Sequence, residues 1–209
     1  MAQKLKENMR NSIIEAAKKE LLTFGYKDAS MRNIAKMSNM TVGNLYRYFT
    51  SKDDLIQTIV TPTLKEIEDS IYKDCDIYIN FGSQNTTIDL DKLEMISVFD
   101  HVSDDLVEIY FRNKDEIQIL MMHSSLNAEL SLWFSSLIAH IISEEVKETL
   151  SESEIAILAR AYANSIFNGV TECLKDVTLP KDRLKYVLKL YFRSFTSGIH
   201  LNKSTILGV

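Results

Sequence analysis

The chain has little cysteine, no long apolar run and none of the common catalytic signatures. Cys75 and Cys173 are the only cysteines among 209 residues and form no Cys-x-x-Cys pair, so we expect neither a disulfide framework nor a metal site. No segment approaches the roughly 20 consecutive apolar residues that span a bilayer, and no cleavable apolar leader follows the first basic residues. We therefore expect a cytoplasmic protein that does not contact membranes.

Enzyme motifs are also missing. The four histidines, at positions 101, 123, 140 and 200, show no His-Glu-x-x-His spacing, and there is no Gly-rich phosphate loop or Gly-x-Ser-x-Gly elbow. The carboxylates of Asp104-Asp105 and Glu144-Glu145 are adjacent, so on a helix each pair diverges. We expect no catalytic residue and no cofactor; His123 and His140 are read as packing or rim residues.

Charge is unevenly distributed along the chain. Residues 1–60 hold 10 Lys and Arg against 6 Asp and Glu, whereas residues 61–209 hold 14 against 23. A basic N-terminal segment suits contact with phosphates, and an acidic remainder argues against nucleic acid spread over the whole surface.

The N-terminal segment has the periodicity of a helix. Ile13, Ala17, Leu21 and Phe24 recur at intervals of four, four and three residues, which places all four on one inward face. Gly25 follows directly and can end this helix as a left-handed cap.

Two further short helices are predicted around a tight turn. Ser30 is a good N-cap for a helix that turns Ile34 and Ala35 inward. Ser38-Asn39 forms the turn, because Asn tolerates a positive φ better than most residues.

The next helix has two contrasting faces. Thr41 can cap it, and a rotation of about 100° per residue points Leu45 and Phe49 inward together. The opposite side carries Gly43, Asn44 and Arg47, with Tyr46 and Tyr48 on the flanks. Asn can pair with adenine, Arg with guanine or phosphate, and Gly permits close approach of the backbone. The pattern predicts a helix-turn-helix whose second helix enters the DNA major groove; the alternative is a surface turn between amphipathic helices.

A fourth helix begins at once. Ser51 caps it, Asp53 and Asp54 suit the dipole of its first turn, and Lys52 can contact phosphate. The helix can run on to Ile71, although Pro62 is expected to kink or break it.

In these motifs the chain resembles the tetracycline-repressor (TetR) family of bacterial transcriptional regulators, over about residues 8–60. The Ser38-Asn39 turn departs from the Ala-Gly that is usual in the family. The resemblance rests on Ile14-Glu-Ala-Ala17, Phe24-Gly-Tyr26, Ile34-Ala35, Leu45-Tyr-Arg-Tyr-Phe49 and Ser51-Lys-Asp-Asp-Leu55.

The resemblance implies a set of DNA contacts. Our own assignment of faces supports Gly43, Asn44 and Arg47 best, while Tyr46 can equally pack in the core. By resemblance, phosphates are held by Ser30, Thr41, Tyr48 and Lys52, base edges lie near Arg32, Val42, Gly43, Asn44 and Tyr46, and Arg47 lies at the rim.

The rest of the chain is also helical in pattern. Residues 80–89 read as a loop, and helical periodicity then covers approximately 90–112, 114–123, 125–146, 152–176 and 181–200, with no useful strand alternation. The fold class is therefore all-α, with a helix-turn-helix domain at 1–55 and a larger helical effector-binding and dimerisation domain at 56–209.

The last two helical segments carry broad apolar stripes. Paired with their symmetry mates they would form a four-helix bundle, the dimer interface that the resemblance also implies. The alternative is that both stripes fill a monomeric core. A dimer would place two helix-turn-helix domains so that each binds one half-site of a palindromic DNA sequence.

Residues 95–172 are expected to enclose a small-molecule effector, although aromatic and Met side chains at helical spacing also suit plain core. Acidic residues around Asp100, Asp104, Asp105 and Glu108 could balance a cationic ligand or could face water. The candidate wall residues are His101, Tyr110, Phe111, Met121, Met122, Trp133, Phe134, Tyr162, Phe167 and Asn168.

The sequence thus predicts a homodimeric, ligand-responsive transcriptional regulator, a repressor that binds a palindromic double-stranded operator and is released by its effector. A regulator whose effector promotes DNA binding is an alternative within the same fold. A constitutive DNA-binding module whose body docks a protein is another class, and a helical-bundle enzyme is a third.

Overall fold

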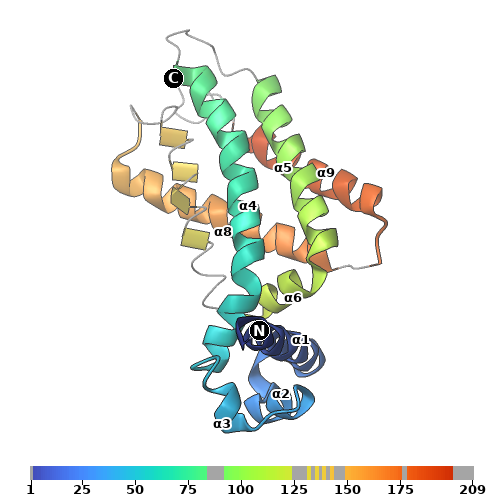
Figure 1. Cartoon of the computed structure of the whole chain (residues 1–209). Coiled ribbons are helices and arrows are strands. Elements are labelled where there is room, and N and C mark those ends of the chain that lie inside the picture. Colours follow the sequence, from blue (N-terminus) through green and yellow to red (C-terminus); the bar gives the residue numbers. More distant parts are fainter. Residues whose placement is uncertain are drawn as a thin grey trace. The chain divides into compact units, whose positions relative to one another are not determined.

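The computed structural model describes residues 2–83, 92–123, 131–132, 135–136, 138–139, 142–143, 149–175 and 178–199. Every element assigned within these ranges is an α-helix (Figure 1), which confirms the all-α prediction. The chain divides into two compact units: unit 1 is Met1–Glu66 with Asn113–Asn127, and unit 2 is Ile67–Arg112 with Ala128–Val209. The domain boundary after residue 55 stays a prediction. None of the described helices is long and apolar enough to cross a membrane.

Unit 1 contains α1 (Ala2–Asp28), α2 (Met31–Met37), α3 (Val42–Leu45), the beginning of α4 (Lys52–Ser83) and α6 (Lys114–Met122). Helix α1 packs against α2 and α6, and α2 packs against α3. One apolar cluster joins these helices, and α6 contributes Ile119 and Leu120 to it. The residues predicted to face inward in this segment, Ile13, Ala17, Leu21, Ile34, Ala35, Leu45 and Phe49, all belong to the cluster.

Phe24 is the exception to the predicted inward face. Its side chain is 53% exposed, so its assignment to the core was wrong. The helical path is interrupted directly after it, at Gly25 (φ 73°, ψ 176°), and buried Ala29 lies beyond the interruption. Glycine adopts this positive φ more readily than other residues. The extended ψ, however, is not that of the predicted left-handed helical cap.

Helix α4 differs from its prediction at two points. It continues through Pro62 to Ser83, so a break at Pro62 was wrong, and residues 80–83 of the predicted loop are helical. Proline removes one amide donor from a helix, and the buried neighbours Val60 and Thr63 anchor the helix on both sides of it. Residues 84–89 of the predicted loop lie outside the described residues.

Unit 2 contains the rest of α4 together with α5 (Lys92–Arg112), α8 (Glu152–Lys175) and α9 (Lys181–Ile199). Helix α9 packs against both α5 and α8. The predicted ranges of α5, α6, α8 and α9 agree with the observed ones to within about two residues at each end. Much of the predicted segment 125–146 lies outside the described residues.

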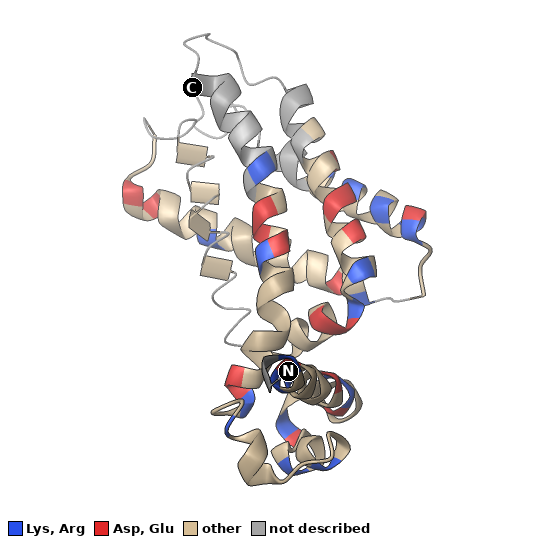
Figure 2. Ribbon diagram, in the orientation of Figure 1, with Lys and Arg blue, Asp and Glu red and all other residues tan. Residues whose placement is uncertain are grey.

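A ladder of ion pairs connects α5 and α9, with blue residues of α9 beside red residues of α5 in Figure 2. Asp100, Asp104 and Glu108 are spaced four residues apart on α5, and basic residues at the same spacing on α9 meet them. Arg193 Nη2 lies 2.6 Å from Asp100 Oδ2, Lys189 Nζ lies 2.8 Å from Asp104 Oδ2, and Lys185 Nζ lies 2.9 Å from Glu108 Oε1.

These pairings give the predicted acidic cluster a structural role. The hydrogen bonds from Lys181 and Lys185 lower the pKa of Glu108 to about 2. Asp105 accepts a hydrogen bond from Ser70 at 2.9 Å within the same unit. The carboxylates considered for balancing a cationic ligand are therefore engaged by side chains of unit 2.

Helices α8 and α9 meet closely at a glycine. Tyr191 on α9 donates a hydrogen bond to the Ser165 carbonyl at 2.5 Å. A Cβ at Gly169 would overlap the Tyr191 ring and hydroxyl, so only glycine permits this ring position on α8.

Candidate nucleic-acid interface

The start of α2 is fixed by one hydroxyl group and one carboxylate. Ser30 has the extended backbone of an N-cap, and its Oγ accepts from the Arg32 amide at 3.3 Å, as predicted. Glu20 on α1 is only 3% exposed, and its Oε1 accepts from the Ser30 amide at 3.1 Å and from Asn33 Nδ2 at 3.0 Å. This buried carboxylate joins α1 to α2, a role that the sequence analysis missed.

The turn between α2 and α3 has the predicted geometry. Asn39 has a φ of 55°, and the Met40 amide donates to the Ala35 carbonyl at 2.9 Å, which is the long hydrogen bond of a Schellman ending. Ser38 is buried, and its Oγ donates to the Ile34 carbonyl at 2.8 Å. The turn therefore satisfies its own polar groups without the usual Ala-Gly pair.

Helix α3 is short and tightly closed. Thr41 Oγ1 accepts from the Asn44 amide at 3.2 Å, which confirms the predicted N-cap. After Leu45 the backbone changes to three-residue spacing, since the Arg47 amide donates to Asn44 and the Tyr48 amide to Leu45. This tightening brings the chain directly to the next helix.

The two faces of this segment are as predicted for Leu45, Phe49, Gly43 and Arg47, whereas Asn44 is half-buried. Leu45 and Phe49 are 0% and 1% exposed behind it, whereas Gly43, Tyr46 and Arg47 are exposed on the outside. A Cβ at Gly43 would meet no atom within 4 Å, so the backbone there is open to close approach. Tyr46 is 47% exposed, which removes the core-packing alternative for its ring.

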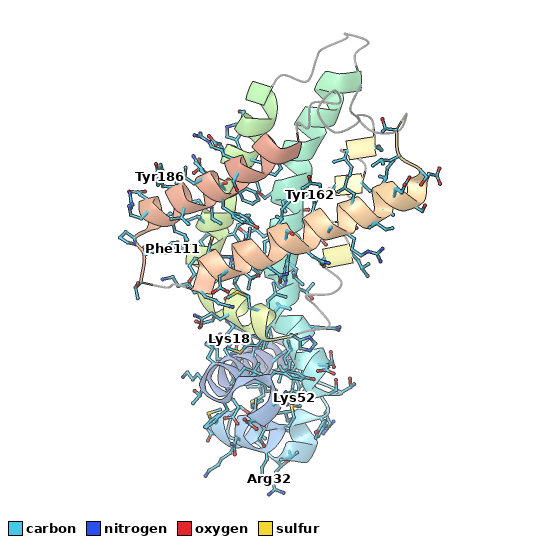
Figure 3. All side chains as sticks on the ribbon, turned by 180° about the vertical axis from the view of Figure 1, so that it is seen from behind. Lys18, Arg32, Lys52, Phe111, Tyr162 and Tyr186 are labelled. Atoms are coloured by element: carbon cyan, nitrogen blue, oxygen red, sulfur yellow. The ribbon has the colours of Figure 1, made fainter. Side chains whose placement is uncertain are left out.

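The remaining predicted DNA contacts surround this surface. Arg32 is exposed and extends outward from α2 (Figure 3), and Thr41 is exposed. Ser30, Val42, Asn44, Tyr48 and Lys52 are half-buried. Their roles toward DNA stay predictions.

Lys52 binds backbone carbonyl groups within unit 1, which the sequence analysis did not predict. Its Nζ donates to the carbonyls of Tyr26 at 2.5 Å and Ala29 at 3.1 Å, and it lies 4.6 Å from the centre of the Tyr26 ring. Two donors of its ammonium group thus tie the beginning of α4 to the chain around the α1–α2 junction. A phosphate contact would have to use the third.

The first turn of α4 joins α1 and the end of α6. Asp53 Oδ1 accepts from the Tyr26 hydroxyl at 2.8 Å and lies 3.4 Å from His123 Nε2. The buried His123 ring packs edge-on against Tyr26, with centroids 4.9 Å apart. Hydrogen bonds from Tyr26 and His123 lower the pKa of Asp53, and the Asp53 hydrogen bond raises the pKa of Tyr26. His123 is therefore a hydrogen-bonded packing residue of unit 1, one of its two predicted roles.

A hollow lies between α1 and the α3 segment. It has a volume of about 440 Å³ and is lined by Leu5, Lys6 and Met9 from α1 and by Asn44, Arg47 and Tyr48 from the α3 segment. Three predicted DNA contacts thus share one concave surface with the beginning of α1.

The residues predicted to bind an effector differ in burial and belong to both units. Tyr110 is buried and packs edge-on against Phe111, with centroids 5.4 Å apart, while Tyr162 and Phe167 are half-buried and His101 and Asn168 are exposed. Met121 and Met122 belong to unit 1. Trp133 and Phe134 lie outside the described residues, and a common effector site stays a prediction. The described residues include no group of three His, Cys, Asp or Glu side chains that could hold a metal ion.

Comparison with known proteins places this interface in a family. Residues 13–59 match the family of bacterial regulatory proteins called tetR. The chain is similar to YhgD, an uncharacterized HTH-type transcriptional regulator of Bacillus subtilis strain 168, with 41% identity over 56 residues. This similarity spans 27% of the chain and 29% of the length of YhgD.

Solved structures resemble the chain over nearly its whole length. A TetR-family regulator from Syntrophomonas wolfei has a TM-score of 0.65 at 16% identity, covering 95% of this chain and 100% of that one. A TetR-like regulator from Rhodococcus sp. RHA1 has a TM-score of 0.58 at 14% identity, covering 91% and 96%. Similarity at this identity concerns the fold.

The fold and the interface define an all-helical protein of the helix-turn-helix class. Its residues 13–59 carry the DNA-binding domain that characterises the tetR family of bacterial regulatory proteins. Proteins of this family are DNA-binding regulators and not enzymes.

Proposed function

We propose that the chain is a homodimeric transcriptional regulator, a repressor that reads a palindromic DNA operator and leaves it when a small molecule binds the helical body. The reading surface is the exposed side of the α3 segment, where Asn44 and Arg47 meet base edges or phosphates. Ser30, Thr41 and Tyr48 position the segment on the DNA backbone, and Arg32 of α2 lies near base edges.

One observation carries the DNA-reading part of this proposal. Leu45 and Phe49 are inaccessible behind the segment, while Gly43 and Arg47 are open to solvent on the other side. The capped ends and the satisfied turn hold this orientation before any DNA arrives, so little ordering is needed on binding.

Dimerisation is supported by apolar side chains left exposed on α8 and α9. Ile157 on α8 and Tyr186 and Leu190 on α9 are exposed although large and hydrophobic (Tyr186 is labelled in Figure 3). A second copy could cover them, and two-fold symmetry would then present two reading surfaces to two half-sites.

The effector part of the proposal requires only differential binding. A ligand that prefers the non-binding state by about 3 kcal/mol would weaken operator affinity by up to about a hundredfold. The match of residues 13–59 to the tetR family supports this mode of regulation. The half-buried aromatic residues Phe111, Tyr162 and Phe167 of unit 2 are the first positions to test.

Selection of bound duplexes from a random pool tests the proposal most broadly. We expect an enriched sequence with two inverted half-sites and a complex that contains two protein chains per duplex, or a multiple of two. Enrichment of a single half-site would contradict the dimer, and recovery of no preferred sequence would contradict the DNA-reading function.

A further inference from the structure

Helix α1 begins well before the family match. The match starts at residue 13, yet α1 starts at Ala2 and runs on without interruption into the matched segment. The additional residues include Lys4, Lys6 and Arg10 against one acid, Glu7. This chain therefore has a basic helical extension next to the common part of the domain.

The extension turns one cationic face in a defined direction. At 100° per residue, Lys6 and Arg10 lie on the same face of α1 as Ile13 and Ala17, which are completely buried. Lys4 lies on the opposite side. The face that is apolar over the core thus becomes cationic where α1 passes beyond the core.

That cationic face borders the reading segment. Lys6 lines the hollow described above, together with Asn44 and Arg47. Arg10 holds the helix in place, since its guanidinium carbon lies 5.3 Å from the centre of the Phe49 ring and its Nη2 lies 3.5 Å from Thr58 Oγ1.

Lys6 and Arg47 are two cations on the edge of a single hollow. Within the described part of the chain Lys6 has no hydrogen-bonding or acidic partner, and its side chain is exposed. Two like charges around a concavity repel each other unless an anion lies between or beside them. A DNA strand supplies such anions at regular intervals.

We propose that the first turns of α1 are a second DNA contact of this protein. Lys6 binds a backbone phosphate next to the bases that the α3 segment meets, and Leu5 and Met9 contact the adjoining deoxyribose. This inference rests on the proposed DNA-reading function and extends the contact surface beyond the residues that the family resemblance implies.

The test compares two variants with the same change in charge. Lys6→Gln removes the proposed contact, and Lys4→Gln is the matched control two residues away on the opposite face. Affinity is measured against salt concentration for the selected duplex and for a random duplex. One lost phosphate contact should reduce the slope of log K against log salt by about 0.9 and weaken binding roughly five- to tenfold at 0.1 M salt.

We expect this loss for Lys6→Gln on both duplexes and a clearly smaller one for Lys4→Gln. In ethylation interference, one phosphate that matters for the unmodified protein should become silent with Lys6→Gln and stay sensitive with Lys4→Gln. Thermal unfolding verifies that both variants are folded, as expected for exposed side chains.

Two results would overturn the inference. An unchanged salt slope for Lys6→Gln excludes the phosphate contact. Equal losses of affinity for Lys6→Gln and Lys4→Gln would mean that only the net charge of the helix matters. If the unmodified protein still prefers one duplex, the proposed function stands in both cases. Absence of any preferred duplex for the unmodified protein would overturn the function and this inference together.

Discussion

Units 1 and 2 use different interactions to hold their helices. In unit 1, Ser30, Thr41 and Ser51 cap the starts of α2, α3 and α4. Glu20 and Lys52 bind main-chain groups of neighbouring segments. In unit 2, exposed charges pair along α5 and α9, and one ring packs on a glycine. Hydrogen bonds to the backbone fix the positions of helices more strictly than exposed ion pairs do. Such rigidity suits a surface that must fit the major groove of DNA.

The largest effect should follow from removing the buried carboxylate of unit 1. Glu20→Ala leaves the Ser30 amide and Asn33 without their acceptor, so we expect a loss of about 3 kcal/mol in the free energy of unfolding. Glu20→Gln keeps an acceptor oxygen and should lose less. Denaturant titration measures both, and equal losses would mean that filling the space matters more than accepting hydrogen bonds.

In unit 2 the most sensitive position is Gly169, where a larger side chain would clash with Tyr191. Gly169→Ala forces the Tyr191 ring away from α8, and overpacking of this kind costs about 2 kcal/mol. When Tyr191→Ala is already present, adding Gly169→Ala should cause no further loss of stability, because the clashing ring is gone. If Gly169→Ala alone leaves thermal stability unchanged, the close contact between these helices is not as described.

The turn in unit 1 should show a smaller effect. Asn39→Ala places a residue that lacks the tolerance of Asn at positive φ, and should lower stability by about 1 kcal/mol. Asn39→Gly should preserve or slightly raise stability, because glycine adopts this φ freely. A stable alanine variant would contradict the left-handed conformation.

The smallest effect belongs to the exposed ladder of unit 2. Because the pKa of Glu108 falls from 4.5 to about 2 on pairing, its stabilising contribution is complete above pH 4.5 and disappears as the pH falls toward 2. Glu108→Gln should therefore lower stability slightly at neutral pH, leave it unchanged near pH 2, and make the loss of stability between these pH values smaller. Identical acid unfolding curves for the two proteins would exclude the pairing.

Local signals in the sequence account for what could be predicted. Ser30, Thr41 and Ser51 each cap the expected helix, the last by accepting a hydrogen bond from the Asp54 amide at 3.0 Å. Asn39 adopts the expected φ. These preferences could be predicted because they depend on residues only a few positions apart. The bonds of Glu20 to Ser30 and of Lys52 to Tyr26 cross ten and 26 positions. No local pattern contains them.

Unit 2 shows a different limit. The helix ranges followed from periodicity, but aromatic and Met residues have the same spacing whether they fill a core or line a cavity. Tyr110 proved to be core, and Asp104 and Glu108, considered as ligand contacts, are paired with α9. The sequence pattern could not reveal these partners because they lie more than 70 residues away.

The central claim is that the outer side of the α3 segment reads base pairs, and Asn44→Ala tests it most directly. Affinity is measured for the selected duplex and for a random duplex at the same salt concentration. Loss of one specific base contact should reduce the ratio of the two affinities by roughly five- to 150-fold, corresponding to about 1–3 kcal/mol, while random-duplex affinity changes little. An equal loss on both duplexes, or no loss on either, would contradict the claim.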